Sequence, residues 1–379
     1  MKKILNGLWT LIRLSFALLF IGGLTYYVID KIQEKKNLMD IEEYSPKSTL
    51  VVPQNQVKRA KYPFIDVHNH QFDMPLKDLS QLVTEMDSLN MAFLINLSGF
   101  RGLYLQQSLK NVKKHAPTRF GLFVNIDFEK IDDPDFASEQ VAIIEQAVQD
   151  GVMGLKVYKS LGLTDRAKNG NRIAINDPRL DPIWKACGDN HIPVLIHSGE
   201  PESFWNPKDR YNERWLELRQ KPNRYRDPKT NPSFEEVLSE QHAVFAKHPN
   251  TTFINAHLGW MGNNLDRLGT HLDRYPNVMT EIGAVLAELG RQPKRARQFF
   301  VDYQDRILFG KDAYKVSEYY TYFRVLETDD EYFDYYRKRH AHWKMYGLAL
   351  PDSILKKIYF KNALRLFPTI DSKLFKPAL

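Results

Sequence analysis

The stretch Phe64-Ile65-Asp66-Val67-His68-Asn69-His70 decides the fold of this 379-residue chain. Its first four residues form a short, mainly apolar run that is typical of a buried strand. Side chains two positions apart on a strand point to the same side, so His68 and His70 direct their imidazoles at one point where the strand ends. Imidazole is a common ligand of zinc-like metals. A single pair is a weak signal, and surface or strand-capping histidines are the alternative.

Three later strand-like runs also end in a potential metal ligand. Residues 192–196 are followed by His197, residues 252–256 by His257, and residues 306–311 by Asp312. One such ending could arise by chance, but four endings in the order His-x-His, His, His, Asp are much harder to explain that way. The pattern therefore predicts a metal site built from the ends of several strands.

Strand-like and helix-like segments alternate from residue 62 onward. Strands are expected to begin near residues 64, 91, 120, 154, 192, 252, 278 and 307. Amphipathic helices are expected between them, among others at residues 76–89, 136–149, 179–190, 235–247 and 265–275. Such alternation indicates parallel βαβ units, and eight units close a barrel. We therefore predict an α/β fold, a (β/α)8 TIM barrel preceded by an N-terminal transmembrane helix. The absence of a Gly-rich dinucleotide fingerprint argues against a Rossmann fold.

Composition excludes several classes of protein. Cys187 is the single cysteine, which rules out an internal disulfide framework and a thiolate zinc cluster. The net charge of +7 is concentrated near the N-terminus, because residues 1–62 hold ten Lys and Arg against five Asp and Glu. The rest of the chain carries only +2 and has no basic tract typical of a nucleic-acid surface. We expect a small-molecule substrate and no nucleic-acid partner.

Residues 14–29 form an uncharged apolar run near the N-terminus. Extending the run back to residue 4 introduces only one charge, that of Arg13. A membrane-spanning helix needs about 20 apolar residues. The competing interpretation is a cleaved signal peptide, but no small-residue cleavage site follows the run. We predict a membrane anchor at residues 1–30, a polar tether at 31–61 and a barrel domain at 62–379.

The orientation of the anchor follows from less evidence. Lysines flank the apolar run on both sides, so the positive-inside rule hardly discriminates between the two orientations. A short tail before a single anchor usually stays inside, so we expect the barrel on the non-cytoplasmic side of a membrane. The sequence does not indicate an oligomeric state.

The order of these motifs resembles the amidohydrolase superfamily, specifically the amidohydrolase-related (amidohydrolase 2) branch of metal-dependent TIM-barrel hydrolases. The matching stretches, spread over residues 62–368, are 65–70, 154–158, 194–201, 254–259, 307–313 and 358–367. The resemblance implies a divalent metal ion, expected to be zinc and to be one ion rather than two. Its implied ligands are His68, His70, His197 and Asp312, and Asp312 would also accept a proton from the activated water.

The resemblance also gives roles to two further strand ends. His257 occupies a position where members have either a ligand of a second ion or a group beside the substrate, and we predict a catalytic role for it. A histidine that merely caps the strand is the alternative. Lys156 ends the fourth predicted strand, where members with two ions have a carboxylated lysine that bridges them. We expect Lys156, or the nearby Lys159 if the register differs, to bind an anionic substrate group or to form an interior ion pair.

Two loop residues complete the predicted substrate-binding set with Lys156. Glu200 lies three residues after His197 and could bind the substrate or cap its loop. Arg101 follows the second strand and could clamp a carboxylate, although a solvated arginine is the alternative. Lys311 departs from the pattern of the branch, in which the residue before the aspartate is usually small and uncharged. This departure puts the local geometry around the aspartate in question.

The predicted constellation indicates a metal-dependent hydrolase in which an activated water attacks an amide, ester or lactone carbonyl. Two rivals stay open. Some members of the branch are non-oxidative decarboxylases, and release of carbon dioxide would identify that reaction. A barrel without activity could instead serve as a membrane-tethered binding protein, which absence of bound metal would support.

Overall fold

The computed structural model describes residues 1–36, 38–41 and 43–378. The chain separates into two compact units, Met1–Val51 and a second unit that begins at Val52. The predicted tether at 31–61 includes residues 37 and 42, and the predicted barrel domain includes residue 379; these three lie outside the described residues. The boundaries 1–30, 31–61 and 62–379 stay predictions.

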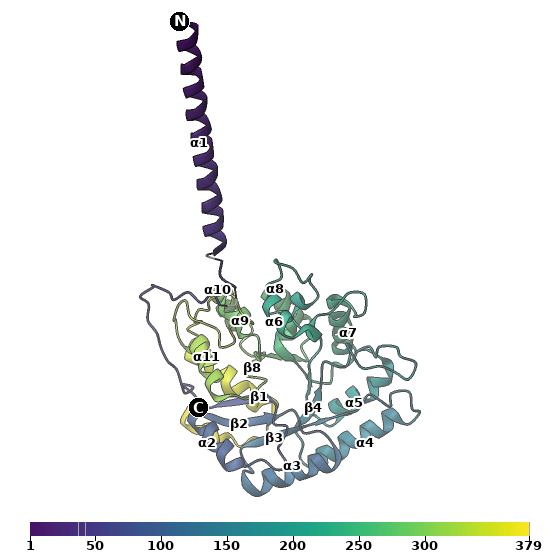
Figure 1. Cartoon of the computed structure of the whole chain (residues 1–379). Coiled ribbons are helices and arrows are strands. Elements are labelled where there is room, and N and C mark those ends of the chain that lie inside the picture. The colour runs from purple at the N-terminus through teal and green to yellow at the C-terminus, as the bar shows by residue number, and fades with distance from the viewer. Residues whose placement is uncertain (37, 42, 379) are drawn as a thin grey trace. The chain divides into compact units, whose positions relative to one another are not determined.

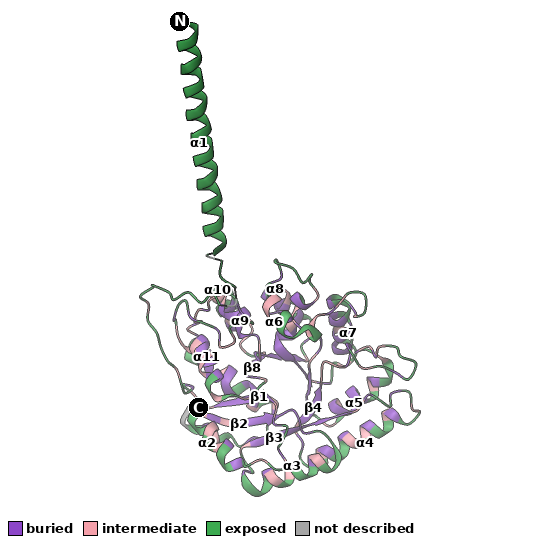
Figure 2. Ribbon diagram, in the orientation of Figure 1, coloured by how far each residue is buried: buried purple, intermediate pink, exposed green. Residues whose placement is uncertain are grey.

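Helix α1, Lys2–Lys36, contains the predicted apolar segment. Its 35 residues correspond to about 50 Å of helix, whereas the hydrocarbon core of a bilayer is about 30 Å thick. All of its side chains are exposed (Figure 2), including the large apolar ones. The helix is therefore long enough and apolar enough to cross a membrane, a property that a signal sequence shares.

The second unit is an eight-stranded parallel barrel over the described residues, which confirms the predicted α/β TIM-barrel fold. Each strand pairs with its sequence neighbours in the order β1 to β8, and helices lie around the strands (Figure 1). The strands are β1 Phe64–Asn69, β2 Met91–Asn96, β3 Phe120–Asn125, β4 Gly154–Val157, β5 Val194–Ile196, β6 Phe253–Asn255, β7 Val278–Glu281 and β8 Ile307–Leu308.

Backbone contacts between β1 and the chain around β8 bring the two edges of the sheet together. Val67 N donates to Phe309 O at 3.0 Å, and Asp312 N donates to His68 O at 2.6 Å. Asn69 and Asp312 form a parallel bridge. The first and last strands therefore meet where the predicted metal ligands of both lie.

The helices of the second unit follow the strands in turn. They are α2 Leu79–Leu89, α3 Gly102–His115, α4 Phe136–Gln149, α5 Asp181–Asp189, α6 Trp215–Gln220, α7 Phe234–Lys247, α8 Leu265–Arg274, α9 Leu286–Gly290, α10 Pro293–Asp302, α11 Val316–Glu327, α12 Asp352–Lys356 and α13 Asn362–Leu366. Several begin at side-chain caps that satisfy free backbone amides. For example, Ser233 accepts from Glu236 N at the start of α7, and Asn264 accepts from Arg267 N at the start of α8.

Burial explains why short apolar runs form the strands. Every residue of β1 and β3 is buried, and so is every residue of the shorter strands β4 to β8. Strands covered on both sides read as nearly continuous apolar runs. Polar residues are confined mainly to the strand ends, where they meet at the rim that carries active sites in TIM barrels.

Candidate metal centre

His68 and His70 converge on Asp312, as the strand geometry predicts. The Nε2 atom of each imidazole lies 3.6 Å from Asp312 Oδ1. Ligands that surround a zinc ion tetrahedrally at 2.0–2.2 Å are separated by about 3.4 Å. The three side chains therefore have the spacing of a coordination sphere. His68 Nε2 is buried and has no hydrogen-bond partner among the described residues, so its lone pair is free for a cation.

The protonation states of these groups also suit a cation. Burial, followed by the charge of Lys156, lowers the pKa of His68 well below its usual value. The same two causes lower the pKa of His70 to about 4. Burial acts to raise the pKa of Asp312, but the neighbouring histidines and Lys156 outweigh it and lower that pKa to about 2. Neutral imidazoles and an ionised carboxylate are the states that metal ligation requires.

Glu281, the last residue of β7, is a site residue that the sequence interpretation missed. It is fully buried, and its Oε1 accepts from His68 Nδ1 at 2.9 Å and from His257 N at 2.6 Å. A carboxylate on Nδ1 fixes the ring so that Nε2 faces the metal position. Gly310 permits this contact, because a Cβ there would lie 2.3 Å from Glu281 Oε2. The signal in the sequence that could have identified Glu281 is that the strand predicted near residue 278 ends in this glutamate.

Replacing Glu281 with glutamine is expected to weaken metal binding by about 10–100-fold, the usual effect of losing a partner of a metal-ligating histidine. The amide of Glu281→Gln is neutral and cannot orient His68 as strongly. Competition with a chelator of known affinity measures the change. Glu240→Gln, on α7, is a matched control that removes a buried carboxylate paired with Arg172. Equal metal affinity in both variants would contradict the orienting role of Glu281.

Hydrogen bonds determine how His257 and His197 are protonated. His257 Nδ1 lies 2.7 Å from Gly283 O, and a carbonyl can only accept, so Nδ1 carries the proton. In neutral His257 the Nε2 atom is then an acceptor, and it lies 3.3 Å from His197 Nδ1, which can donate to it. His197 Nε2 is left with a free lone pair, buried and without a partner among the described residues. The Nε2 atom of His197 is therefore available to a metal, whereas both ring nitrogens of His257 lie in hydrogen bonds.

His257 and Asp312 both adopt left-handed backbone conformations, with φ of 58° and 77°. Such conformations cost about 1–3 kcal/mol in residues other than glycine, and they cluster at functional sites. Both residues lie directly at the rim, where the chain turns away from β6 and β8. The local backbone strain thus coincides with the positions predicted to carry the chemistry.

Lys156 points its amino group into the same region. It is 1% exposed, and its Nζ has no hydrogen-bond partner among the described residues. Burial lowers its pKa to about 7, although Asp312 and Glu281 act in the opposite direction. The second lysine of this strand end, Lys159, instead binds Glu200 Oε1 at 2.5 Å. The structure thereby resolves the register that the sequence left open.

The other predicted binding residues lie in ion pairs. Glu200 is buried between Lys159 and Arg226. Arg101 is exposed just before α3 and pairs with Asp127. Lys311 turns away from the metal position, since its Nζ binds Glu318 Oε2 at 2.6 Å and lies over the rings of three tyrosines. The unusual lysine before Asp312 is therefore accommodated by the outer helix.

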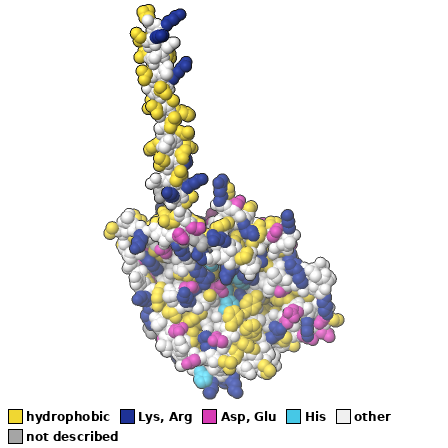
Figure 3. Space-filling model, in the orientation of Figure 1, with side chains coloured by type: hydrophobic (Ala, Val, Ile, Leu, Met, Phe, Trp, Pro, Cys, Tyr) yellow, Lys and Arg dark blue, Asp and Glu magenta, His cyan; other side chains and the backbone are white. Residues whose placement is uncertain are grey.

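Aromatic side chains lead outward from His70. The Phe72 ring stacks on the His70 ring at 5.6 Å between centroids, and Phe72 in turn contacts Phe100 at 6.5 Å. Phe72 and Phe100 are partly exposed on the loops that follow β1 and β2. In Figure 3 a histidine is visible in a hollow of the drawn face, with hydrophobic side chains gathered beside it. One wall of the site entrance is thus apolar.

Comparisons with known proteins identify the family of the chain. The family model Amidohydro_2, described as amidohydrolase, matches residues 58–369. No curated protein sequence matches the chain.

Three solved structures resemble the chain at low sequence identity. An uncharacterized TIM-barrel protein from Bordetella bronchiseptica is 16% identical with a TM-score of 0.53, covering 81% of this chain and 99% of that one. An amidohydrolase II is 15% identical with a TM-score of 0.51, covering 80% and 99%. A 2,6-dihydroxybenzoate decarboxylase is 15% identical with a TM-score of 0.48, covering 81% and 99%. At 15–16% identity, the similarity to the first two of these structures shows a shared fold.

The family model extends over all eight strands and leaves out the N-terminal helix. The matched range contains His68, His70 and Asp312, which the barrel brings within coordination distance of one another, and it also contains His197 and His257, which follow β5 and β6. This chain therefore belongs to the metal-dependent amidohydrolase family Amidohydro_2.

Proposed function

We propose that this protein is a metal-dependent hydrolase that adds water to an amide, ester or lactone carbonyl. The observation that supports this proposal most directly is the convergence of His68 and His70 on Asp312 Oδ1, each at 3.6 Å. Two neutral imidazole nitrogens beside an ionised carboxylate form a donor set that suits a divalent cation.

The proposed ligands of this cation are His68, His70, His197 and Asp312. A bound divalent ion supplies Lewis-acid chemistry, which activates water and polarises a carbonyl. Zinc fits a site of three nitrogen ligands and one oxygen ligand. One ion is proposed rather than two, because His257 Nε2 accepts from His197 and Lys156 keeps its amine for other contacts.

The side chains around the cation have separate proposed roles. Asp312 accepts a proton from the attacking water and returns it to the leaving group. His257, held by Gly283 O, orients His197 and faces the reacting atoms. Lys156 binds an anionic group of the substrate, because its buried amine has no partner of its own among the described residues. Glu200 and Arg101 are proposed to contact the substrate from the surrounding loops.

The test uses the full-length protein purified in detergent. Metal content per chain is measured by elemental analysis, and the protein is screened against amides, esters, lactones and aromatic carboxylates. About one zinc per chain and hydrolysis of a carbonyl substrate would support the proposal. Release of carbon dioxide without uptake of water would favour a decarboxylase, and absence of metal would favour an inactive binding barrel.

We also propose that α1 anchors the protein in a membrane as a single-pass helix, with the barrel on the non-cytoplasmic side. All of α1 is exposed, and its apolar side chains need a nonpolar environment. Cell fractionation is expected to recover the chain in the membrane fraction at its full mass of 44.3 kDa. A soluble protein, or one shortened by roughly 25–30 residues, would show that the segment is a cleaved signal.

A further inference from the structure

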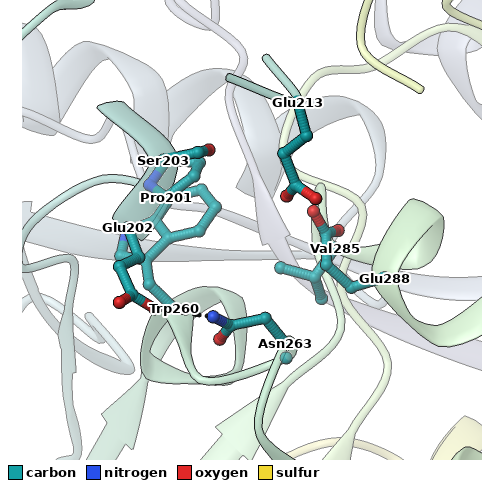
Figure 4. Close-up of a pocket in the computed structure, with 9 residues that line it drawn as sticks. Pro201, Glu202, Ser203, Glu213, Trp260, Asn263, Val285 and Glu288 are labelled. Atoms are coloured by element: carbon teal, nitrogen blue, oxygen red, sulfur yellow. Dashed lines mark hydrogen bonds between the residues drawn. The ribbon is translucent and has the colours of Figure 1, made fainter. Parts of the chain in front are cut away.

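A small pocket lies on the same rim as the proposed metal centre. Its lining comes from the loops that follow β5, β6 and β7, namely Pro201, Glu202, Ser203, Glu213, Trp260, Gly262, Asn263, Val285 and Glu288 (Figure 4). The space open to the centre of a water-sized group is ≈ 20 Å³. About 10–15 Å³ is enough for one water, so the pocket has room for at least one group of that size.

The pocket is acidic. Three of its lining residues are glutamates, and none of the described lining residues is lysine or arginine. Glu213 is held by Arg291 at 2.7 Å and Glu202 by the Asn263 amide at 2.7 Å. These outer contacts fix the two carboxylates at the pocket walls without filling the pocket itself.

Glu288 gives the pocket an unsatisfied acceptor. It is 9% exposed, and its Oε1 accepts from Arg214 at 3.1 Å. Its Oε2 is buried and has no hydrogen-bond partner among the described residues. Figure 4 shows the carboxylates of Glu288 and Glu213 pointing toward each other. Burial raises the pKa of Glu288, although Arg214 and Arg291 act in the opposite direction. A cationic donor between the two carboxylates would give this Oε2 a partner.

The pocket is close to the proposed chemistry. The Trp260 ring, which lines the pocket, stacks on His257 at 4.6 Å between centroids and lies 5.7 Å from His197. Pro201 comes four residues after His197, and Trp260 comes three residues after His257. A ligand that reacts beside His257 can therefore place its other end in the pocket by passing one indole ring.

We propose that this pocket binds a primary ammonium group, and that the substrates of this protein carry such a group at the end of a chain that leads away from the reacting carbonyl. The substrate assignment rests on the proposed hydrolase function, whereas the binding site does not. A primary ammonium has the size of a water molecule and three donors, which match carboxylates on facing walls. A quaternary ammonium carries the same charge but has no N–H donor for the carboxylates.

A binding experiment tests the pocket without any turnover. The probe is n-butylammonium chloride, followed by tryptophan fluorescence, with 1-butanol and tetramethylammonium chloride as comparisons. Saturable binding of n-butylammonium alone is expected, with an affinity at least about tenfold weaker in Glu288→Gln, since a buried hydrogen-bonded charge pair is worth more than 1.4 kcal/mol. Trp260→Phe should remove the change in fluorescence on binding, while the other five tryptophans still fluoresce.

Matched variants guard against trivial explanations. Glu139→Gln changes an exposed glutamate of α4 and should bind n-butylammonium normally. Glu213→Gln changes the half-exposed wall carboxylate and provides a second test if Glu288→Gln unfolds, which circular dichroism would reveal. Three outcomes would overturn the ammonium site. They are equal affinity for n-butylammonium in the wild type and the folded pocket variants, equally tight binding of tetramethylammonium, and a pocket that holds only an ordered water.

A turnover experiment separates the pocket from the proposed function. The probes are the 4-nitroanilides of 6-aminohexanoate and of hexanoate, which differ in the ammonium group. The wild type is expected to favour the amino compound in kcat/KM, and Glu288→Gln is expected to lose that preference, whereas the control Glu139→Gln should keep both the preference and the activity. Equal kcat/KM for the two anilides would refute the substrate assignment. Failure to hydrolyse either would count against the hydrolase, while the binding experiment decides the pocket.

Discussion

The double substitution His68→Ala with His70→Ala is expected to abolish metal binding while the barrel stays folded. The two imidazoles supply two of the four proposed ligands, and both point their Nε2 atoms at Asp312. Alanine offers no ligand atom, and the single carboxylate and His197 that would be left cannot form a closed site. Elemental analysis measures the metal retained per chain, and turnover on any substrate found should fall with it.

Folding of this double variant needs its own control. His68 is fully buried, so its removal leaves a cavity with a cost of about 1–3 kcal/mol, typical of a single buried change. Circular dichroism and the thermal midpoint report whether the barrel survives. His115→Ala with His191→Ala removes two exposed histidines and should leave the metal content unchanged. If the His68/His70 variant also retains its metal, the proposed centre is wrong.

The barrel could be predicted from the sequence because its strands are contiguous buried runs. The predicted starts at residues 64, 91, 120, 154, 278 and 307 coincide with the observed strands, and the other two are displaced by one or two residues. The convergence of His68 and His70 on Asp312 could be predicted as well. Side chains alternate along β1 and the strand ends share one rim of the barrel, and both features are consequences of backbone geometry. Local pattern and fold topology were sufficient for both.

The remaining features depend on contacts between distant segments. Glu281 ends β7 as the ligands end other strands, but its role becomes visible only where its carboxylate meets His68 from β1. The sequence could not select between Lys156 and Lys159, because the choice follows from strand register and from the partner Glu200. The protonation of His257 likewise depends on Gly283 O, a backbone atom that no motif identifies.

Asp312→Asn is expected to lower turnover at least about a hundredfold while the protein stays folded and keeps much of its metal. General acid–base groups typically contribute about 10²–10⁴-fold, and an amide cannot accept the proton that Asp312 is proposed to take. Asparagine is also a fitting substitution for the backbone. Asp312 has φ of 77°, and asparagine enters the left-handed region more readily than most residues. The variant therefore tests the carboxylate rather than the turn.

Asp312→Ala is the comparison that divides ligation from proton transfer. Alanine removes the ligand atom and disfavours the left-handed turn, so this variant should lose metal as well as activity. The asparagine variant should differ from it by retaining metal and a normal thermal midpoint. Near-normal turnover of Asp312→Asn would show that another group, such as His257 or Glu200, is the base. Loss of metal in step with activity in both variants would mean that Asp312 acts as a ligand, because proton transfer alone cannot account for a metal that no longer binds.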